Sequence, residues 1–118
     1  METLKGKEIK DILSKKQETI KTKTFIAVFQ KNNLGKPRFA FIASKKLSKK
    51  AVDRNRAKRL LKESVRMFYP QIQHLGYDII LIARRYILGK KIHQVLKDIE
   101  ILFKNLRERN EKVTDMAD

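Results

Sequence analysis

The sequence predicts an α/β fold in which helices pack on a small sheet. Residues 77–83, YDIILIA, form a nearly continuous apolar run between turn residues, which is typical of a buried central strand. Two earlier segments, 24–30 and 38–44, are rich in β-forming residues. Apolar residues then recur at steps of three and four between Ile92 and Leu106, which is typical of an amphipathic helix. Strands and helices within one chain of 118 residues indicate a single layered core.

The N-terminal elements follow from the same patterns. Apolar residues at roughly helical spacing predict a short helix over 5–15, and a short strand is expected near 19–22. The segments 24–30, TFIAVFQ, and 38–44, RFAFIAS, flank KNNLGKP, whose Asn, Gly and Pro are typical turn residues. The two segments are therefore predicted to form an antiparallel hairpin.

Two further helices are predicted. The first covers 51–68, where Ser48 or Asp53 could cap its start and Pro70 is expected to end it. The second covers about 91–109. The resulting order is helix, two or three strands, helix, strand, helix.

Composition limits the classes of function. We expect one domain over 1–109 and a flexible tail over 110–118. The chain has no cysteine, which excludes disulfides, a thiol nucleophile and Cys-ligated metals. No secretory signal and no apolar run near the ~20 residues of a membrane span are visible, so a cytoplasmic protein is expected. The net charge of +16 indicates a polyanionic partner, most often nucleic acid.

The charge is concentrated in one segment. Residues 45–66 hold ten basic and two acidic residues, a net charge of +8 and half of the total. On a helix of about 100° per residue, one face is mainly apolar. That face comprises Ala57, Leu60, Leu61, Ser64, Val65 and Phe68. The opposite face comprises Asn55, Arg59, Lys62 and Arg66. A charge run is often only a solvated face, but this density and one-sidedness favour polyanion binding.

Catalytic chemistry has no comparable signal. The only histidines, His74 and His93, have no partner at a metal or acid–base spacing, the aspartates are scattered, and there is no phosphate-binding glycine loop. We therefore predict no catalytic residue and no metal ligand in this chain. Asn55 can offer a donor and an acceptor to a base or sugar, or it can be an ordinary capping or solvent-facing amide.

Residues 44–63, SKKLSKKAVDRNRAKRLLKE, resemble the signature of the bacterial ribonuclease P protein subunit. In that family a Ser-Lys-Lys segment ends a strand and is followed by a helix carrying Ala-Val-x-Arg-Asn-Arg-x-Lys-Arg-x-x-Arg-Glu. The direct matches are Arg54, Asn55, Arg56, Lys58, Arg59 and Glu63. Lys62 stands where arginine is usual, so a two-pronged contact is not expected there. The resemblance extends over about residues 4–107.

The resemblance implies a two-layer αβββαβα sandwich with a small mixed sheet and a left-handed crossover through the arginine-rich helix. It implies a protein that pairs with a catalytic RNA to remove the 5′ leader from precursor tRNA. Mg²⁺ is then bound mainly by the RNA, which performs the chemistry. The implied contacts with that RNA are Lys45, Lys46, Arg54, Asn55, Arg56, Lys58, Arg59, Lys62 and Arg66.

The resemblance also implies a cleft for the leader beside the sheet. Its predicted residues are Ile9, Leu13, Ile26, Val28, Ile42, Arg54, Asn55 and Lys58. Family members often have aromatic residues in this cleft, whereas Ile9, Leu13 and Val28 are aliphatic. Stacking of a base on an aromatic ring is worth ~1–3 kcal/mol, so a weaker grip or a larger share for polar contacts is expected. Alternatively, the aliphatic residues simply pack against one another.

Three other functions stay open. A structural RNA-binding protein of ribosomal type shares the charge and size, but it would not predict the ordered Arg-Asn-Arg helix between these strands. An autonomous nuclease would cleave precursor tRNA without RNA. A membrane-surface role for 51–68 would need the apolar face that should cover the sheet. We therefore expect RNA partners, and neither DNA nor a membrane.

Overall fold

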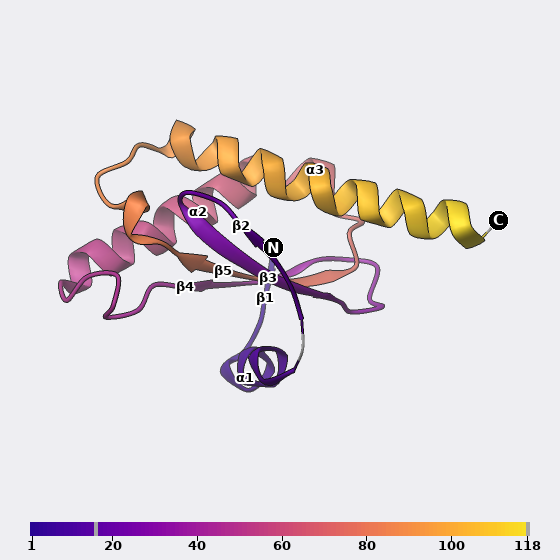
Figure 1. Ribbon diagram of the computed structural model, residues 1–118, viewed down its shortest axis with the longest axis horizontal. Coiled ribbons are helices and arrows are strands. Elements are labelled where there is room, and N and C mark those ends of the chain that lie inside the picture. The colour runs from indigo at the N-terminus through magenta and orange to yellow at the C-terminus, as the bar shows by residue number, and fades with distance from the viewer. Residues whose placement is uncertain (16, 118) are drawn as a thin grey trace.

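A five-stranded mixed sheet lies between one short helix on one face and two long helices on the other (Figure 1). A computed structural model describes residues 1–15 and 17–117, with side chains as far as residue 110. The elements are β1 Glu2–Thr3, α1 Gly6–Ser14, β2 Glu18–Lys21, β3 Phe25–Lys31, β4 Arg38–Ile42, α2 Ala51–Ile72, β5 Tyr77–Ala83, the 3₁₀ helix η1 Arg85–Ile87 and α3 Ile92–Ala117. The predicted fold class is confirmed. The short strand β1 and the helix η1 were not predicted.

The strand order is β1-β4-β5-β3-β2, so the predicted hairpin between 24–30 and 38–44 is wrong. β5 lies between these strands, antiparallel to β3 and parallel to β4. Six of its seven residues are buried, and a central position removes this apolar surface from water on both faces. The turn after β3 instead crosses the start of β5, where the Asn32 N–H donates to the Gly76 carbonyl at 3.0 Å.

α2 connects the parallel strands β4 and β5 as a crossover, as the resemblance implies. The helix continues to Ile72, so Pro70 does not end it. A proline in the last turn removes a single helical hydrogen bond, and the extra turn buries Ile72 completely. The expected cap is also wrong, because Lys50 is the N-cap residue. The Ser48 hydroxyl instead donates to the Asp53 carboxylate at 2.8 Å.

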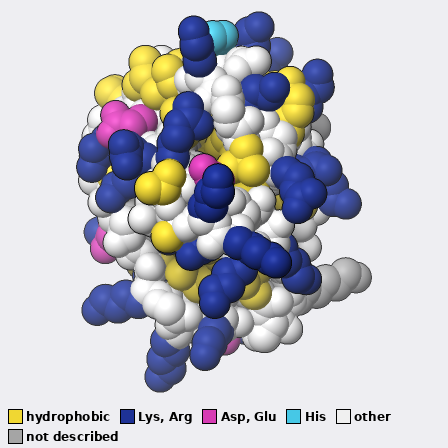
Figure 2. Space-filling view, turned by 90° about the vertical axis from the view of Figure 1, so that its left-hand side faces the viewer, with side chains coloured by type: hydrophobic (Ala, Val, Ile, Leu, Met, Phe, Trp, Pro, Cys, Tyr) yellow, Lys and Arg dark blue, Asp and Glu magenta, His cyan; other side chains and the backbone are white. Residues whose placement is uncertain are grey.

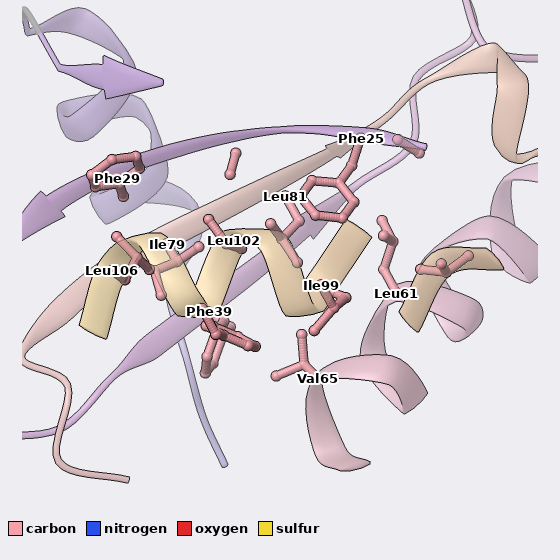
Figure 3. Close-up of a cluster of buried hydrophobic side chains, with 14 of the residues drawn as sticks. Phe25, Phe29, Phe39, Leu61, Val65, Ile79, Leu81, Ile99, Leu102 and Leu106 are labelled. Atoms are coloured by element: carbon pink, nitrogen blue, oxygen red, sulfur yellow. The ribbon is translucent and has the colours of Figure 1, made fainter. Parts of the chain in front are cut away.

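The larger core fills the space between the sheet and the helices α2 and α3 (Figure 3). Alternation along the strands sends the phenylalanines of β3 and β4 toward this side. The Phe39 and Phe103 rings meet edge to face at 6.2 Å. The labelled side chains of this core are Phe25, Phe29, Phe39, Leu61, Val65, Ile79, Leu81, Ile99, Leu102 and Leu106.

The opposite face of the sheet carries a smaller cluster beneath α1. Its buried residues are Leu4, Ile12, Val28, Ala40 and Ile80. Its half-buried residues are Ile9, Ile26, Ile42 and Ile82. One nine-residue helix therefore covers this face, and part of the apolar surface stays accessible to solvent.

α3 begins at Ile92 and extends beyond the predicted end at residue 109. Its buried Asp98 accepts hydrogen bonds from the Thr24 backbone N–H (2.9 Å) and hydroxyl (2.7 Å), which join α3 to the start of β3. The flexibility expected over 110–118 stays a prediction, because Asp118 and the side chains of 111–117 lie outside the described residues. Within the described part of the chain, no helix combines the length and apolarity that crossing a membrane requires.

Candidate nucleic-acid interface

α2 presents its cations away from the core, as the helical pattern predicts. Ala57, Leu61, Ser64 and Val65 are buried against the sheet and α3. The exposed cations form what we call the α2 ridge. It comprises Arg56, Lys58, Arg59, Lys62 and Arg66. Asn55 is also exposed at the start of this surface.

The α2 ridge has little internal charge compensation. Arg66 and Glu63 form an ion pair at 3.4 Å, and both side chains are about half exposed. Lys58, Lys62 and Arg66 repeat at steps of four, and like charges at this spacing destabilise a helix by a few tenths of a kcal/mol per pair. The ridge therefore opposes helix stability slightly, and its positive field faces solvent.

Arg54 and Arg56 already bind the protein's own backbone. Arg54 is half-buried, and its Nη1 donates to the Ser48 and Lys49 carbonyls, both at 2.9 Å. Arg56 donates through Nη2 to the Lys90 carbonyl at 2.9 Å. These bonds fix two loops against α2 and orient both guanidinium groups, whose other N–H groups can still face a phosphate.

The turn before α2 extends the cationic surface. Lys45 and Lys46 are exposed, and Leu47 is buried and holds the turn on the core. A shallow hollow at this turn is lined by Lys45, Lys46, Ser48, Lys49 and Arg85. Figure 2 looks onto this end of the molecule, and lysine and arginine side chains cover much of it.

The residues predicted for the leader cleft do not share one surface. Ile9, Ile26 and Ile42 are half-buried on the α1 face, and Leu13 is exposed. Val28 is only 4% exposed, because it packs in the same cluster as Ile12. It therefore cannot line an open cleft without movement of α1.

The polar residues predicted for that cleft lie elsewhere. Arg54, Asn55 and Lys58 belong to α2, on the other face of the sheet (Figure 1). The two groups approach each other only through the end of the sheet. There β4 ends at Ile42, which pairs with Ile82 of β5, and the turn that leads into α2 follows.

A polar network that sequence reasoning missed joins α1 to the sheet. Arg38 donates through Nε and Nη2 to the two carboxylate oxygens of the buried Asp78, each at 2.8 Å, and through Nη1 to Glu8. Asn32 Nδ2 also donates to Asp78, at 2.9 Å. The bonds to Asp78 raise the pKa of Arg38, and the Lys5 backbone N–H together with Arg38 lowers the pKa of Glu8. A lone aspartate inside an apolar strand was the available signal.

Sequence reasoning also missed cations near the start of α2. The C-terminal ends of β2, β4 and β5 and the start of β3 meet at one end of the sheet. This end carries Lys21, Lys23, Arg84, Arg85, Lys90 and Lys97, from elements far apart in the sequence. The pair Arg84–Arg85 directly after the apolar strand was the signal that could have revealed them.

Metal-ligating side chains do not gather in the described residues. Within 1–15 and 17–110, no three histidine, aspartate or glutamate side chains form a group that could hold a metal ion. Asp53, Asp78 and Asp98 each accept hydrogen bonds from neighbouring protein groups. His74 and His93 are both exposed, one after α2 and one in α3.

Comparisons with known proteins all match the chain to ribonuclease P proteins. The family model described as Ribonuclease P matches residues 2–107. A ribonuclease P protein component from Pelotomaculum thermopropionicum is 37% identical over 87 residues, which is 74% of this chain and 76% of that protein. One from Caldanaerobacter subterraneus subsp. tengcongensis is 33% identical over 108 residues, or 92% and 90% of the two chains.

Solved structures share the fold. The RNase P protein from Thermotoga maritima superposes with a TM-score of 0.76 at 24% identity, over 89% of this chain and 97% of that one. The Staphylococcus aureus RNase P protein superposes with a TM-score of 0.72 at 26% identity, over 87% and 92%.

Proposed function

The chain belongs to the ribonuclease P protein family, the protein components of a tRNA-processing endoribonuclease, and from this premise we propose how it works. The α2 ridge and the adjoining end of the sheet bind the catalytic RNA of the enzyme. The same complex binds precursor tRNA and removes its 5′ leader in the cytoplasm. Catalysis resides in the RNA.

The observation that carries this proposal is the one-sidedness of α2. Its inner face is buried, so the helix cannot rotate, and its outer face holds the five cations of the α2 ridge with a single acidic partner. Each phosphate that a cation neutralises releases counterions, and this release drives binding. Arginines add paired donors for phosphate, and lysines add mobile point charges.

Binding of the leader draws on the other face of the sheet. Ile9, Ile26 and Ile42 offer half-buried apolar surface beside α1, and this surface ends where the turn with Lys45 and Lys46 begins. We call the surface of Ile9, Ile26 and Ile42 the apolar strip. A single-stranded RNA leader that lies along this strip would therefore meet cations at the end of the sheet. Asn55 and Lys58 lie beyond that turn, in α2. Val28 is buried in the cluster against which Ile9, Ile26 and Ile42 pack.

The chemical step is assigned to the RNA because, within residues 1–15 and 17–110, no group of acidic or histidine side chains is placed to hold a metal ion, and three of the aspartates have protein partners. Asp53, Asp78 and Asp98 bind Ser48, Arg38 and Thr24. Mg²⁺ is assigned mainly to the RNA for the same reason. The protein's own contribution is positive charge, which lowers repulsion between RNA phosphates and so reduces the Mg²⁺ that the reaction needs.

Cleavage of precursor tRNA at low Mg²⁺ tests the proposal. The arms are the protein alone, the ribonuclease P RNA of the same organism alone, and both together. We expect cleavage at the mature 5′ end only with both. Cleavage by the protein alone would indicate a nuclease. No effect of the protein on cleavage, together with tight RNA binding, would indicate a structural RNA-binding protein.

A further inference from the structure

A second basic hollow lies at the same end of the sheet, on its α3 side. Its volume is about 560 Å³, within the range of small-ligand sites. The end of β2, the segment that includes η1 and the first half of α3 form its walls. The lining residues are Lys21, Thr22, Lys23, Arg84, Tyr86, Gln94, Lys97, Asp98 and Ile101.

The charge of this hollow is positive. Four of its lining residues are lysine or arginine, and its one acid, Asp98, is buried and already accepts two hydrogen bonds from Thr24. Arg84 is held in place, because its Nη1 donates to the Thr22 carbonyl at 2.8 Å. The hollow is therefore suited to anions, with one cation positioned in advance.

Tyr86 adds an exposed aromatic ring to the cations of this hollow. Among the six phenylalanines and three tyrosines, Tyr86 alone is exposed, at 46%. Lys90 Nζ lies 4.5 Å from the ring centroid, so a cation already stabilises the ring in this orientation. Ile101, which is 54% exposed, adds apolar surface to the same hollow. An exposed aromatic ring among cations is the arrangement that proteins use to stack an unpaired base and hold its phosphates.

We propose that this hollow binds an unpaired nucleotide of the catalytic RNA, with its base stacked on Tyr86 and its flanking phosphates held by Lys21, Lys23 and Lys97. This inference rests on the proposed function. Continuity with the α2 ridge favours the catalytic RNA as the source of the nucleotide. Arg56, in the ridge, donates to the Lys90 carbonyl, and Lys90 contacts Tyr86.

The position of the hollow also argues against the leader as its ligand. Four lining residues, Gln94, Lys97, Asp98 and Ile101, come from α3, which covers the face of the sheet opposite to α1 (Figure 1). The apolar strip assigned to the leader lies on the α1 face. A leader bound along that strip would have to turn around the sheet to reach Tyr86.

A tryptophan reporter tests stacking directly. The chain has no tryptophan, so Tyr86→Trp introduces a single fluorescent indole. Titration with a strand of eight adenosines should quench it in a saturable way, whereas an abasic strand with the same number of phosphates should not. Tyr69→Trp, on the half-buried part of α2, is the matched control and should respond to neither strand. Equal quenching by both strands, or no quenching by either, would overturn the stacking site.

Affinity for the ribonuclease P RNA of the same organism tests the choice of ligand. Tyr86→Ala should weaken binding about tenfold, because one stacked base is lost, and Tyr86→Phe should bind like the wild type. Tyr86 is exposed, so its substitution removes little buried surface, and circular dichroism checks that each variant is folded. If Tyr86→Ala instead weakens only the binding of precursor tRNA to the assembled enzyme, the hollow serves the leader and our assignment is wrong.

The variant Arg59→Ala/Lys62→Ala, measured in parallel, separates the two proposals. If this ridge variant binds the RNA like the wild type, the proposed function of α2 fails. If it binds weakly while Tyr86→Ala binds like the wild type, the nucleotide site alone fails.

Discussion

The two faces of the sheet are stabilised in different ways. The face toward α2 and α3 has a large core that includes four fully buried or nearly buried phenylalanines. The face toward α1 has a small aliphatic cluster and the network of Arg38, Asp78 and Glu8. Burial of apolar area thus supplies most of the stabilisation on the face toward α2 and α3. On the face toward α1, hydrogen bonds and ion pairs add to a smaller buried area.

This difference assigns separate tasks to the helices. Because α2 is held by its buried face, its outer face can carry repelling cations at little cost to the fold. α1 is short and rests on a few contacts, so it is the helix that can open locally and adapt to a ligand. The domain thus has two different surfaces. The apolar strip beside α1 can adapt to a ligand, whereas the α2 ridge is rigid.

The largest expected effect comes from opening the larger core. Phe103→Ala removes a ring that contacts Phe39 and Phe68, and it should lower the free energy of unfolding by about 3–5 kcal/mol. Urea unfolding followed by circular dichroism measures this change. A loss below about 1 kcal/mol would mean that the α3 side is not the main source of stability.

Breaking the polar network should have the next largest effect. Arg38→Met leaves Asp78 buried with only Asn32 as a partner, and an uncompensated buried charge is costly. We expect a loss of about 2–4 kcal/mol in the free energy of unfolding, part of which Arg38→Met/Asp78→Leu should restore. If the double variant is as unstable as the sum of both single variants, the two side chains are not coupled.

A change in the smaller cluster should cost less and act locally. Ile12→Ala removes the one buried side chain of α1 from the cluster that also holds Val28, and we expect a loss of about 2 kcal/mol in the free energy of unfolding. Hydrogen exchange should show faster exchange for amides in α1, while amides in β5 keep their protection. Equal acceleration in both elements would contradict the independence of the two faces.

The pH dependence of Glu8 should give a smaller effect. Its pKa in the folded protein lies below the usual 4.5, so its stabilising contribution is present above that pH and is lost as the pH falls through the folded pKa. Glu8→Gln should therefore be less stable than the wild type at neutral pH, and this difference should shrink in acid. Thermal unfolding across pH 3–7 measures it, and a difference that is independent of pH would contradict the role of the carboxylate.

Much of the fold was predictable because apolar periodicity is local. The helix at α1, the strand at 18–21 and the buried strand β5 were predicted near their observed positions. The prediction of a hairpin was wrong because β5 lies between the two strands. The order of strands depends on which strand buries the most apolar surface in a central position, and this depends on segments far apart in the sequence. The end of α2 was wrong because burial of Ile72 outweighs the local effect of Pro70.

The candidate site was predictable only where it lies on one element. Helical spacing was sufficient to separate the α2 ridge from the buried face. The cations around Tyr86 come from β2, the segment after β5 and α3, and only the folded sheet brings them together. The burial of Val28 depends equally on the position of α1, which no spacing within β3 reveals.

The central claim is that the α2 ridge is a specific RNA contact surface, and the salt dependence of RNA binding tests it most directly. The test variant is Arg59→Ala/Lys62→Ala. The matched control, Lys31→Ala/Lys104→Ala, removes the same charge from exposed positions outside the ridge. The ridge variant should unfold at the same denaturant concentration as the wild type or slightly higher, because like charges are removed.

The measurement is the slope of log K against log salt for the ribonuclease P RNA. We expect the ridge variant to reduce its magnitude by roughly 1.5–2 units, because two phosphate contacts are lost, and the control variant to keep the slope of the wild type. An unchanged slope for the ridge variant, or an equal reduction for both variants, would contradict the assignment of α2 as the RNA contact surface.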